Sequence, residues 1–198
     1  MHLVIFDIDG TLTETAKVDE ECFVRSFTDV FGFHNIDTDW SHYPHTTDSG
    51  IFHDIFASRI GRPPIAADIS RSRKHFIRLL SLASSKSPFA AVSGAGRLLS
   101  RLTHDDAHRV SLATGCWSDS ARLKMASAGM CYDNYPAASA DDALDRESIV
   151  RLSVHRAAER FGERFTFTIY IGDGIWDAHA CRPLGIPFIG IGSGDRAV

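Results

Sequence analysis

Two aspartates, Asp7 and Asp9, follow directly after the apolar run 3–6. Such a run is typical of a strand buried on both faces of a parallel sheet, and open α/β sheets bind their ligands at the carboxyl ends of their strands. Carboxylates two residues apart on an extended strand point the same way, and two like charges so close need a cation or a shared proton. A hard divalent cation is the simpler interpretation. The alternative is an Asp-rich turn that caps the next helix.

A second pair of carboxylates, Asp173 and Asp177, follows the apolar run 167–171. If a helix begins near Gly174, Asp177 lies in its first turn and faces the same loop region as Asp173. The pair could then bind a metal as one direct ligand and one supporting group. In the alternative interpretation, Asp173 caps this helix and Asp177 complements the helix dipole.

A hydroxyl and a glycine, Thr114 and Gly115, end the apolar run 110–113 and precede a helix-like stretch over 118–128. A hydroxyl and free backbone N–H groups at this position suit a phosphate oxygen. Thr114 as an ordinary helix-entry residue is the alternative. We interpret the neighbouring Cys116 as a small buried hydrophobic residue.

The elements that must position these side chains alternate between strand and helix. Apolar runs at 3–6, 110–113, 167–171 and 187–191 predict strands separated by helical stretches, which indicates an open α/β sheet. Between residues 15 and 88 the apolar residues recur at helical spacing instead. We therefore expect a catalytic core formed by 1–14 and 89–198, with a small helical bundle over 15–88.

Composition narrows the class of protein. The 198 residues are 44% hydrophobic and 23% charged, with a formal net charge of −4, which argues against a nucleic-acid partner bound through a strong positive field. No window approaches the roughly 18 apolar residues that span a bilayer. The N-terminus shows no basic leader, and the four cysteines have no metal-type spacing. We expect reduced thiols in a cytoplasmic protein without membrane contact, and the sequence leaves the oligomeric state open.

The segment Asp7-Ile8-Asp9-Gly10-Thr11, together with Thr114 and the pair Asp173 and Asp177, resembles motifs one, two and four of the haloacid dehalogenase-like hydrolase superfamily. The helical insert resembles the type 1 cap of its phosphoglycolate-phosphatase-like branch. This resemblance implies an α/β fold: a Rossmann-like parallel sheet in a three-layer αβα core, with a small α-helical cap inserted after the first strand.

Motif three of the family is a Lys or Arg upstream of motif four, and Lys124, Arg146 and Arg151 are the candidates. We choose Arg146 because it precedes a helical stripe and because its distance from Asp173 is similar to the gap usual in the family. An exposed arginine that opens a helix is the alternative.

The resemblance implies catalysis through an aspartyl phosphate, with Asp7 as the nucleophile. Asp9 would protonate the leaving alcohol and then take a proton from the attacking water, which requires a pKa raised towards neutrality. Mg²⁺ is the implied cofactor, with Asp7, Asp173 and the backbone carbonyl of Asp9 as ligands and Asp177 in support. Phosphate oxygens would be bound by Thr114, the backbone N–H of Gly115, and Arg146.

Substrate choice is expected to depend on the cap. The polar segment 42–50 leads into a helix, and Thr46, Thr47 and Asp48 are candidates for substrate contact. An N-cap at Thr47 or Asp48 is the alternative. The predicted function is a Mg²⁺-dependent phosphatase acting on a small-molecule phosphate monoester. The alternatives are a phosphomutase similar to beta-phosphoglucomutase, which uses the same Asp7 and Asp9, and a family member without catalytic activity.

Overall fold

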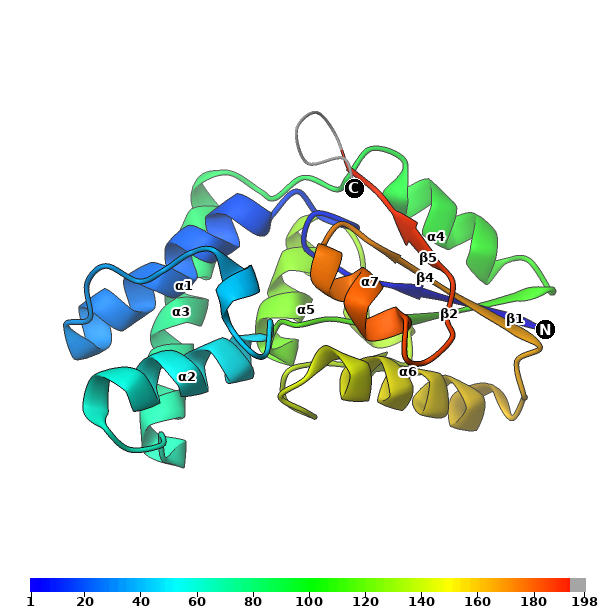
Figure 1. Ribbon diagram of the computed structural model, residues 1–198. Helices are drawn as coiled ribbons and strands as arrows, with labels where there is room; N and C mark the ends of the chain where they lie inside the picture. Colours follow the sequence, from blue (N-terminus) through cyan, green and yellow to red (C-terminus); the bar gives the residue numbers. More distant parts are fainter. Residues whose placement is uncertain (193–198) are drawn as a thin grey trace.

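A five-stranded parallel sheet forms the centre of the protein. The computed structural model describes residues 1–192 (Figure 1), so residues 193–198 of the expected core lie outside the described part. The strands are β1 (His2–Phe6), β2 (His108–Ala113), β3 (Ala137–Ala138), β4 (Phe167–Gly172) and β5 (Phe188–Gly190), in the spatial order β3-β2-β1-β4-β5. The predicted strands are all present. Strand β3 was not predicted, because its two alanines carry no strand signal.

Helices cover both faces of the sheet. They are α4 (Ala95–Thr103), α5 (Ser118–Ser127), α6 (Arg146–Phe161) and α7 (Ile175–Cys181). Side chains alternate along β1, so Val4 and Phe6 pack with α4 and α5, while Leu3 and Ile5 pack with α6 and α7. The predicted three-layer α/β fold, with its helical insertion after the first strand, is confirmed.

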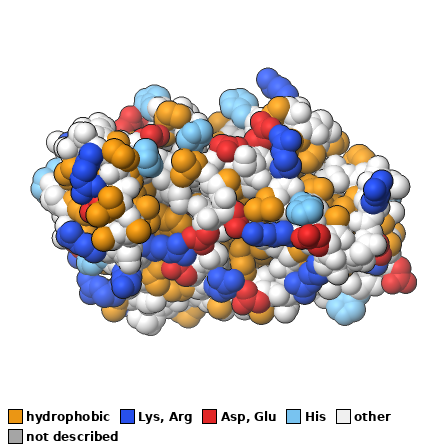
Figure 2. Space-filling model, turned by 90° about the horizontal axis from the view of Figure 1, so that it is seen from below, with side chains coloured by type: hydrophobic (Ala, Val, Ile, Leu, Met, Phe, Trp, Pro, Cys, Tyr) orange, Lys and Arg blue, Asp and Glu red, His pale blue; other side chains and the backbone are white. Residues whose placement is uncertain are grey.

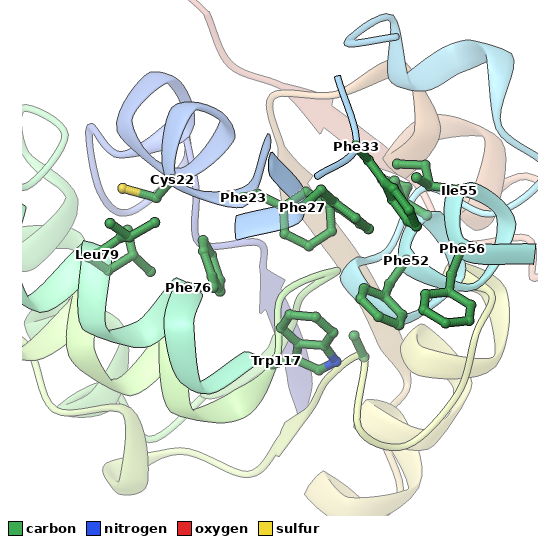
Figure 3. Close-up of a cluster of buried hydrophobic side chains, with 13 residues drawn as sticks. Cys22, Phe23, Phe27, Phe33, Phe52, Ile55, Phe56, Phe76, Leu79 and Trp117 are labelled. Carbon is green, nitrogen blue, oxygen red and sulfur yellow. The ribbon is translucent and has the colours of Figure 1, made fainter. Parts of the chain in front are cut away.

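The inserted segment folds as a helical unit beside the carboxyl ends of the strands (Figure 1). It consists of α1 (Ala16–Phe31), the short helix η1 (Trp40–His42), α2 (Asp48–Ile60) and α3 (Ala66–Lys86). Its core is rich in aromatic rings, with the Phe23 ring edge-on to those of Phe27 and Phe76 at 5.2 and 5.6 Å. Trp117, from the loop after β2, packs into the same cluster (Figure 3).

The two connections between the helical unit and the sheet lie side by side. The amide of Glu14 donates to the carbonyl of Ala90 at 2.9 Å, and the amide of Val92 donates to the carbonyl of Leu12 at 3.0 Å. Thr13 and Ala91 form an isolated antiparallel bridge. Both crossings are therefore tied together by backbone hydrogen bonds.

The surface carries charges of both signs. On the face shown in Figure 2, basic and acidic side chains are interspersed. Within residues 1–192, no helix has the length and apolar character to cross a membrane. All four cysteines are free thiols in the described chain.

Candidate active site

Three carboxylates meet at one edge of the sheet, two from the loops that follow adjacent strands and one from the first turn of α7. Because β1 and β4 are parallel neighbours, the loops after Phe6 and Gly172 lie next to each other. One oxygen from each of Asp7, Asp173 and Asp177 lies within 4.8 Å of the others. The sequence patterns around both loops therefore lead to one shared site.

Gly10 allows the first loop to approach the second. Its φ of 73° lies in the left-handed region, and a Cβ there would stand 1.9 Å from Oδ2 of Asp173. Glycine is the residue that adopts this backbone without strain and leaves space for the carboxylate.

The electrostatics of the cluster favour a cation. Burial raises the pKa of Asp7 well above its ordinary value, and the negative charge of Asp177 raises it further. The pKa of Asp173 rises to about 6 for the same two reasons, and burial also raises that of Asp177. The three carboxylates repel one another when ionised, and a bound cation would offset this repulsion. Their oxygens are hard ligands of the kind that Mg²⁺ prefers. The residues present thus fit the implied metal.

Arg146 is held at this cluster from the first turn of α6. Its Nη1 donates to Oδ1 of Asp177 at 2.6 Å and to Oδ1 of Asp7 at 3.4 Å, and its Nε donates to the carbonyl of Thr46 at 2.9 Å. Burial lowers the pKa of the guanidinium, but the two carboxylates outweigh this effect and raise it. Arg151, another of the three basic candidates, instead forms an exposed ion pair with Glu147.

The end of β2 lies against the same arginine. Thr114 is 1% exposed, and its Oγ1 accepts a hydrogen bond from the amide of Cys116 at 3.2 Å. A Cβ on Gly115 would lie 2.5 Å from Nη2 of Arg146. Gly115 therefore permits close contact between this loop and the guanidinium.

The surroundings of the Asp9 carboxylate differ from those expected for a group with a raised pKa. Its Oδ2 accepts from Nζ of Lys124 and from the thiol of Cys116, both at 2.6 Å, and its Oδ1 accepts from the hydroxyl of Thr15. Burial alone raises the pKa of Asp9, but the charge of Lys124 and these hydrogen bonds outweigh burial and lower it. The predicted rise towards neutrality is wrong for this arrangement. The interpretation of Cys116 as a mere hydrophobic residue also missed its contact with Asp9.

A cavity of about 480 Å³ lies between this edge of the sheet and the helical unit. The predicted site residues in its lining are Asp7, Asp9, Thr46, Thr47, Asp48, Gly115, Arg146 and Asp173, whereas Thr114 and Asp177 lie behind them. Aromatic side chains of Phe23, Trp40 and Trp176 complete the wall.

Two of the predicted substrate contacts have structural partners. The Oγ1 of Thr47 accepts from the amide of Gly50 at 3.0 Å, as the N-cap of α2, and donates to the carbonyl of Leu144 at 2.7 Å. Oδ2 of Asp48 accepts from the amide of Trp117 at 2.8 Å. These side chains attach the helical unit to the core, and their contact with a substrate stays a prediction.

The sequence model of one protein family covers nearly the whole chain. The haloacid dehalogenase-like hydrolase family matches residues 1–185. The chain belongs to this family. The family predicted from the motifs, and its hydrolase class, are confirmed. No curated protein sequence matches this haloacid dehalogenase-like hydrolase.

Solved structures support the same fold for this haloacid dehalogenase-like hydrolase. A hydrolase from Pseudomonas syringae is 19% identical with a TM-score of 0.73, and the match covers 96% of this chain and 84% of that one. CbbY from Rhodobacter sphaeroides in complex with phosphate is 18% identical with a TM-score of 0.72, over 98% and 87% of the two chains. A predicted phosphoglycolate phosphatase from Haemophilus somnus is 12% identical with a TM-score of 0.63, over 95% and 84%.

Proposed function

We propose that the chain is a Mg²⁺-dependent phosphatase that hydrolyses a small-molecule phosphate monoester. The observation that carries this proposal is the meeting of Asp7, Asp173 and Arg146 at the wall of one cavity, with Asp177 in contact directly behind them. The structural likeness to CbbY in complex with phosphate and to a predicted phosphoglycolate phosphatase supports the substrate class.

Asp7 is the nucleophile of the proposed reaction. Its carboxylate attacks phosphorus, the ester bond to the alcohol breaks, and Asp9 protonates the departing oxygen. Water then attacks the phosphorus of the aspartyl phosphate while Asp9 accepts its proton, which releases inorganic phosphate and regenerates Asp7. The covalent intermediate divides one difficult hydrolysis into two easier steps. Asp9 must carry a proton in the first step, whereas its lowered pKa favours the ionised form that accepts a proton in the second step.

The remaining site residues stabilise charge. The guanidinium of Arg146 and the backbone N–H of Gly115, two residues of the cavity lining, are assigned to the phosphate oxygens. The same role for the hydroxyl of Thr114, which is buried behind them, stays a prediction. Asp7, Asp173 and the backbone carbonyl of Asp9 would hold Mg²⁺, with Asp177 in support. The ion would supply positive charge between the nucleophile and the phosphate dianion.

We assign residues 15–88 as a cap over this site. Its residues Thr46, Thr47 and Asp48 line the same cavity as Asp7 and Asp173, so the cap is placed to contact the alcohol half of the ester. A cap that closes over an active site also excludes water that would compete with the chemistry.

The test is phosphate release from a panel of small phosphate esters with and without Mg²⁺. We expect metal-dependent release that Asp7→Asn abolishes, because the amide cannot act as the nucleophile. Asp106→Asn is the matched control, since Asp106 is exposed in the loop before β2. A sugar-phosphate isomerisation assay is run beside it. Interconversion without release would identify a phosphomutase, and silence in both assays would refute catalysis.

A further inference from the structure

A lysine is completely buried beside the candidate active site. The side chain of Lys124, on α5, is 0% exposed, and its Nζ lies 2.6 Å from Oδ2 of Asp9 and 2.6 Å from Oδ1 of Asp19. The same nitrogen donates to Sγ of Cys116 at 3.0 Å. An ammonium group has three protons to donate, so each has a partner here. The three partners come from the loop after β1, from α1 and from the loop after β2.

Packing alone does not explain a charge at this position. Lys124 lies on the inward face of α5, where Ala121 and Met125 are fully buried in the hydrophobic core. An aliphatic side chain of similar length fills such a place without loss of hydration, and replacing buried ion pairs by apolar residues is often neutral or stabilising. The ammonium of Lys124 therefore points to a role in the site itself.

The contacts of Lys124 fix the orientation of the Asp9 carboxylate. Lys124 and Cys116 bind Oδ2, and the hydroxyl of Thr15 binds Oδ1. Both oxygens are thus held while the carboxylate still lines the cavity. A proton-transfer group must lie within hydrogen-bond reach of the reacting oxygen, so a rotation of this carboxylate would remove it from the reaction.

The same ammonium connects Asp9 to the helical unit. Asp19 stands in the first turn of α1, and Thr15 is the residue directly before this helix. Through these two residues, the position of α1 and the orientation of Asp9 depend on each other. Lys124, on α5, belongs to the helices that cover the sheet, and it thus links Asp9 of the core to Asp19 of the helical unit.

We propose that Lys124 is a positioning residue that orients the Asp9 carboxylate toward the leaving oxygen of the substrate and couples that orientation to α1 through Asp19. This inference rests on the proposed phosphatase function. Lys124 acts through Asp9 and does not itself touch the phosphate, because it lies outside the residues that line the cavity.

The dependence of catalysis on the leaving group tests this role. The phenolate of an aryl ester such as p-nitrophenyl phosphate departs without protonation, whereas the alkoxide of an alkyl phosphate needs a proton from Asp9. Removal of the Lys124 charge raises the pKa of Asp9 and so favours its acid form, whereas loss of its orientation takes the acid out of reach of the leaving oxygen. We expect the second effect to dominate in Lys124→Met and to lower kcat/KM by about 100-fold for the best alkyl ester of a glycerol and sugar phosphate panel, the lower end of what general acid catalysis contributes. For p-nitrophenyl phosphate we expect a change of less than about threefold, since transfer to Asp7 needs no acid there.

Two further variants keep the test decisive. Lys74→Met makes the same substitution on the exposed side of α3 and should leave both esters unaffected. Asp19→Asn keeps Lys124 and weakens the coupling to α1, so it should shift the alkyl-to-aryl ratio in the same direction by about fivefold to tenfold; it carries the test if Lys124→Met does not fold.

The outcomes separate the two proposals. A wild-type chain that hydrolyses neither ester refutes the phosphatase function. A wild-type chain that hydrolyses both, with variants that lose activity on both esters equally or on neither, refutes the role of Lys124 and leaves the phosphatase function standing.

Discussion

Substitution of Gly115 by alanine should reduce catalysis without unfolding the chain. The φ of Gly115 lies outside the left-handed region, so alanine can adopt its backbone. A Cβ there would stand 2.5 Å from Nη2 and 2.9 Å from Cζ of Arg146, and 2.9 Å from the carbonyl oxygen of Thr46. Carbon contacts are most favourable near 3.5 Å, so the guanidinium must retreat by about 1 Å.

The size of the effect follows from this displacement. The guanidinium of Arg146 cannot move without breaking hydrogen bonds, because its Nη1 donates to Asp177 at 2.6 Å and its Nε donates to the carbonyl of Thr46 at 2.9 Å. A misplacement of about 1 Å in a catalytic site can cost about 100-fold in rate, which corresponds to about 2.7 kcal/mol of transition-state stabilisation. We therefore expect Gly115→Ala to lower kcat/KM for p-nitrophenyl phosphate by about two orders of magnitude.

Gly96→Ala provides the matched control. Gly96 lies in α4, and a Cβ there would meet no atom within 4 Å. This change should leave kcat/KM unaltered and stabilise the fold by about 0.4–1 kcal/mol, because alanine restricts the unfolded chain. If the loss acts through Arg146, Gly115→Ala should add little in an Arg146→Ala background. A folded Gly115→Ala protein with kcat/KM within threefold of wild type would refute the reasoning.

Three further predictions concern pH, stability and substrate charge. In EDTA, the free energy of unfolding of wild type relative to Asp173→Asn should fall as pH rises from about 4 to above 6, because the pKa of Asp173 is raised in the folded chain from 3.8 to about 6. Saturating Mg²⁺ should reverse this dependence on pH. A difference in unfolding free energy that does not change with pH in EDTA would contradict the raised pKa. Phe76→Ala should cost about 3–5 kcal/mol in urea denaturation, since this ring is 0% exposed in the helical unit, and a loss below about 1 kcal/mol would contradict its role there. Bisphosphates should show at least about tenfold lower kcat/KM than monophosphates of equal size whose alcohol part is uncharged. The reason is that the basic side chains among the described lining residues are Arg146, which is already paired, and Lys17, which is 84% exposed. Equal values of kcat/KM would show that a second phosphate is bound by other means.

The parts of the site that follow a buried strand could be predicted from the sequence. A short apolar run that ends in Asp-x-Asp-Gly specifies both the strand and the loop at its carboxyl end, because the burial of the run and the turn at Gly10 are local properties. The same logic applies to Asp173 and to Thr114. Parallel pairing then brings the three loops to one edge of the sheet, without any knowledge of side-chain packing.

The network around Asp9 could not be predicted in this way. Lys124 lies 115 positions from Asp9, and its charge normally indicates an exposed side chain. One signal was present: Trp117, Ala121, Lys124 and Met125 follow the spacing of one helix face, and the other three are apolar. A lysine within an apolar stripe indicates a buried partner of opposite charge. It does not say which carboxylate that partner is, and so the pKa of Asp9 was predicted in the wrong direction.

The aromatic core of the helical unit shows why this unit and the sheet act together. Trp117 belongs to the loop after β2, yet its ring lies against Phe23, Phe52 and Phe76 of the helical unit at 5.8–6.3 Å. Its amide donates to Asp48 at the start of α2. A movement of the helical unit relative to the sheet would therefore disturb the loop that begins with Thr114 and Gly115, as well as the contacts of Asp9 through α1. The proposed phosphate subsite and the proposed acid-base group are thus both tied to the position of the helical unit, so under the proposed function the cap residues opposite the sheet would influence the chemistry at phosphorus.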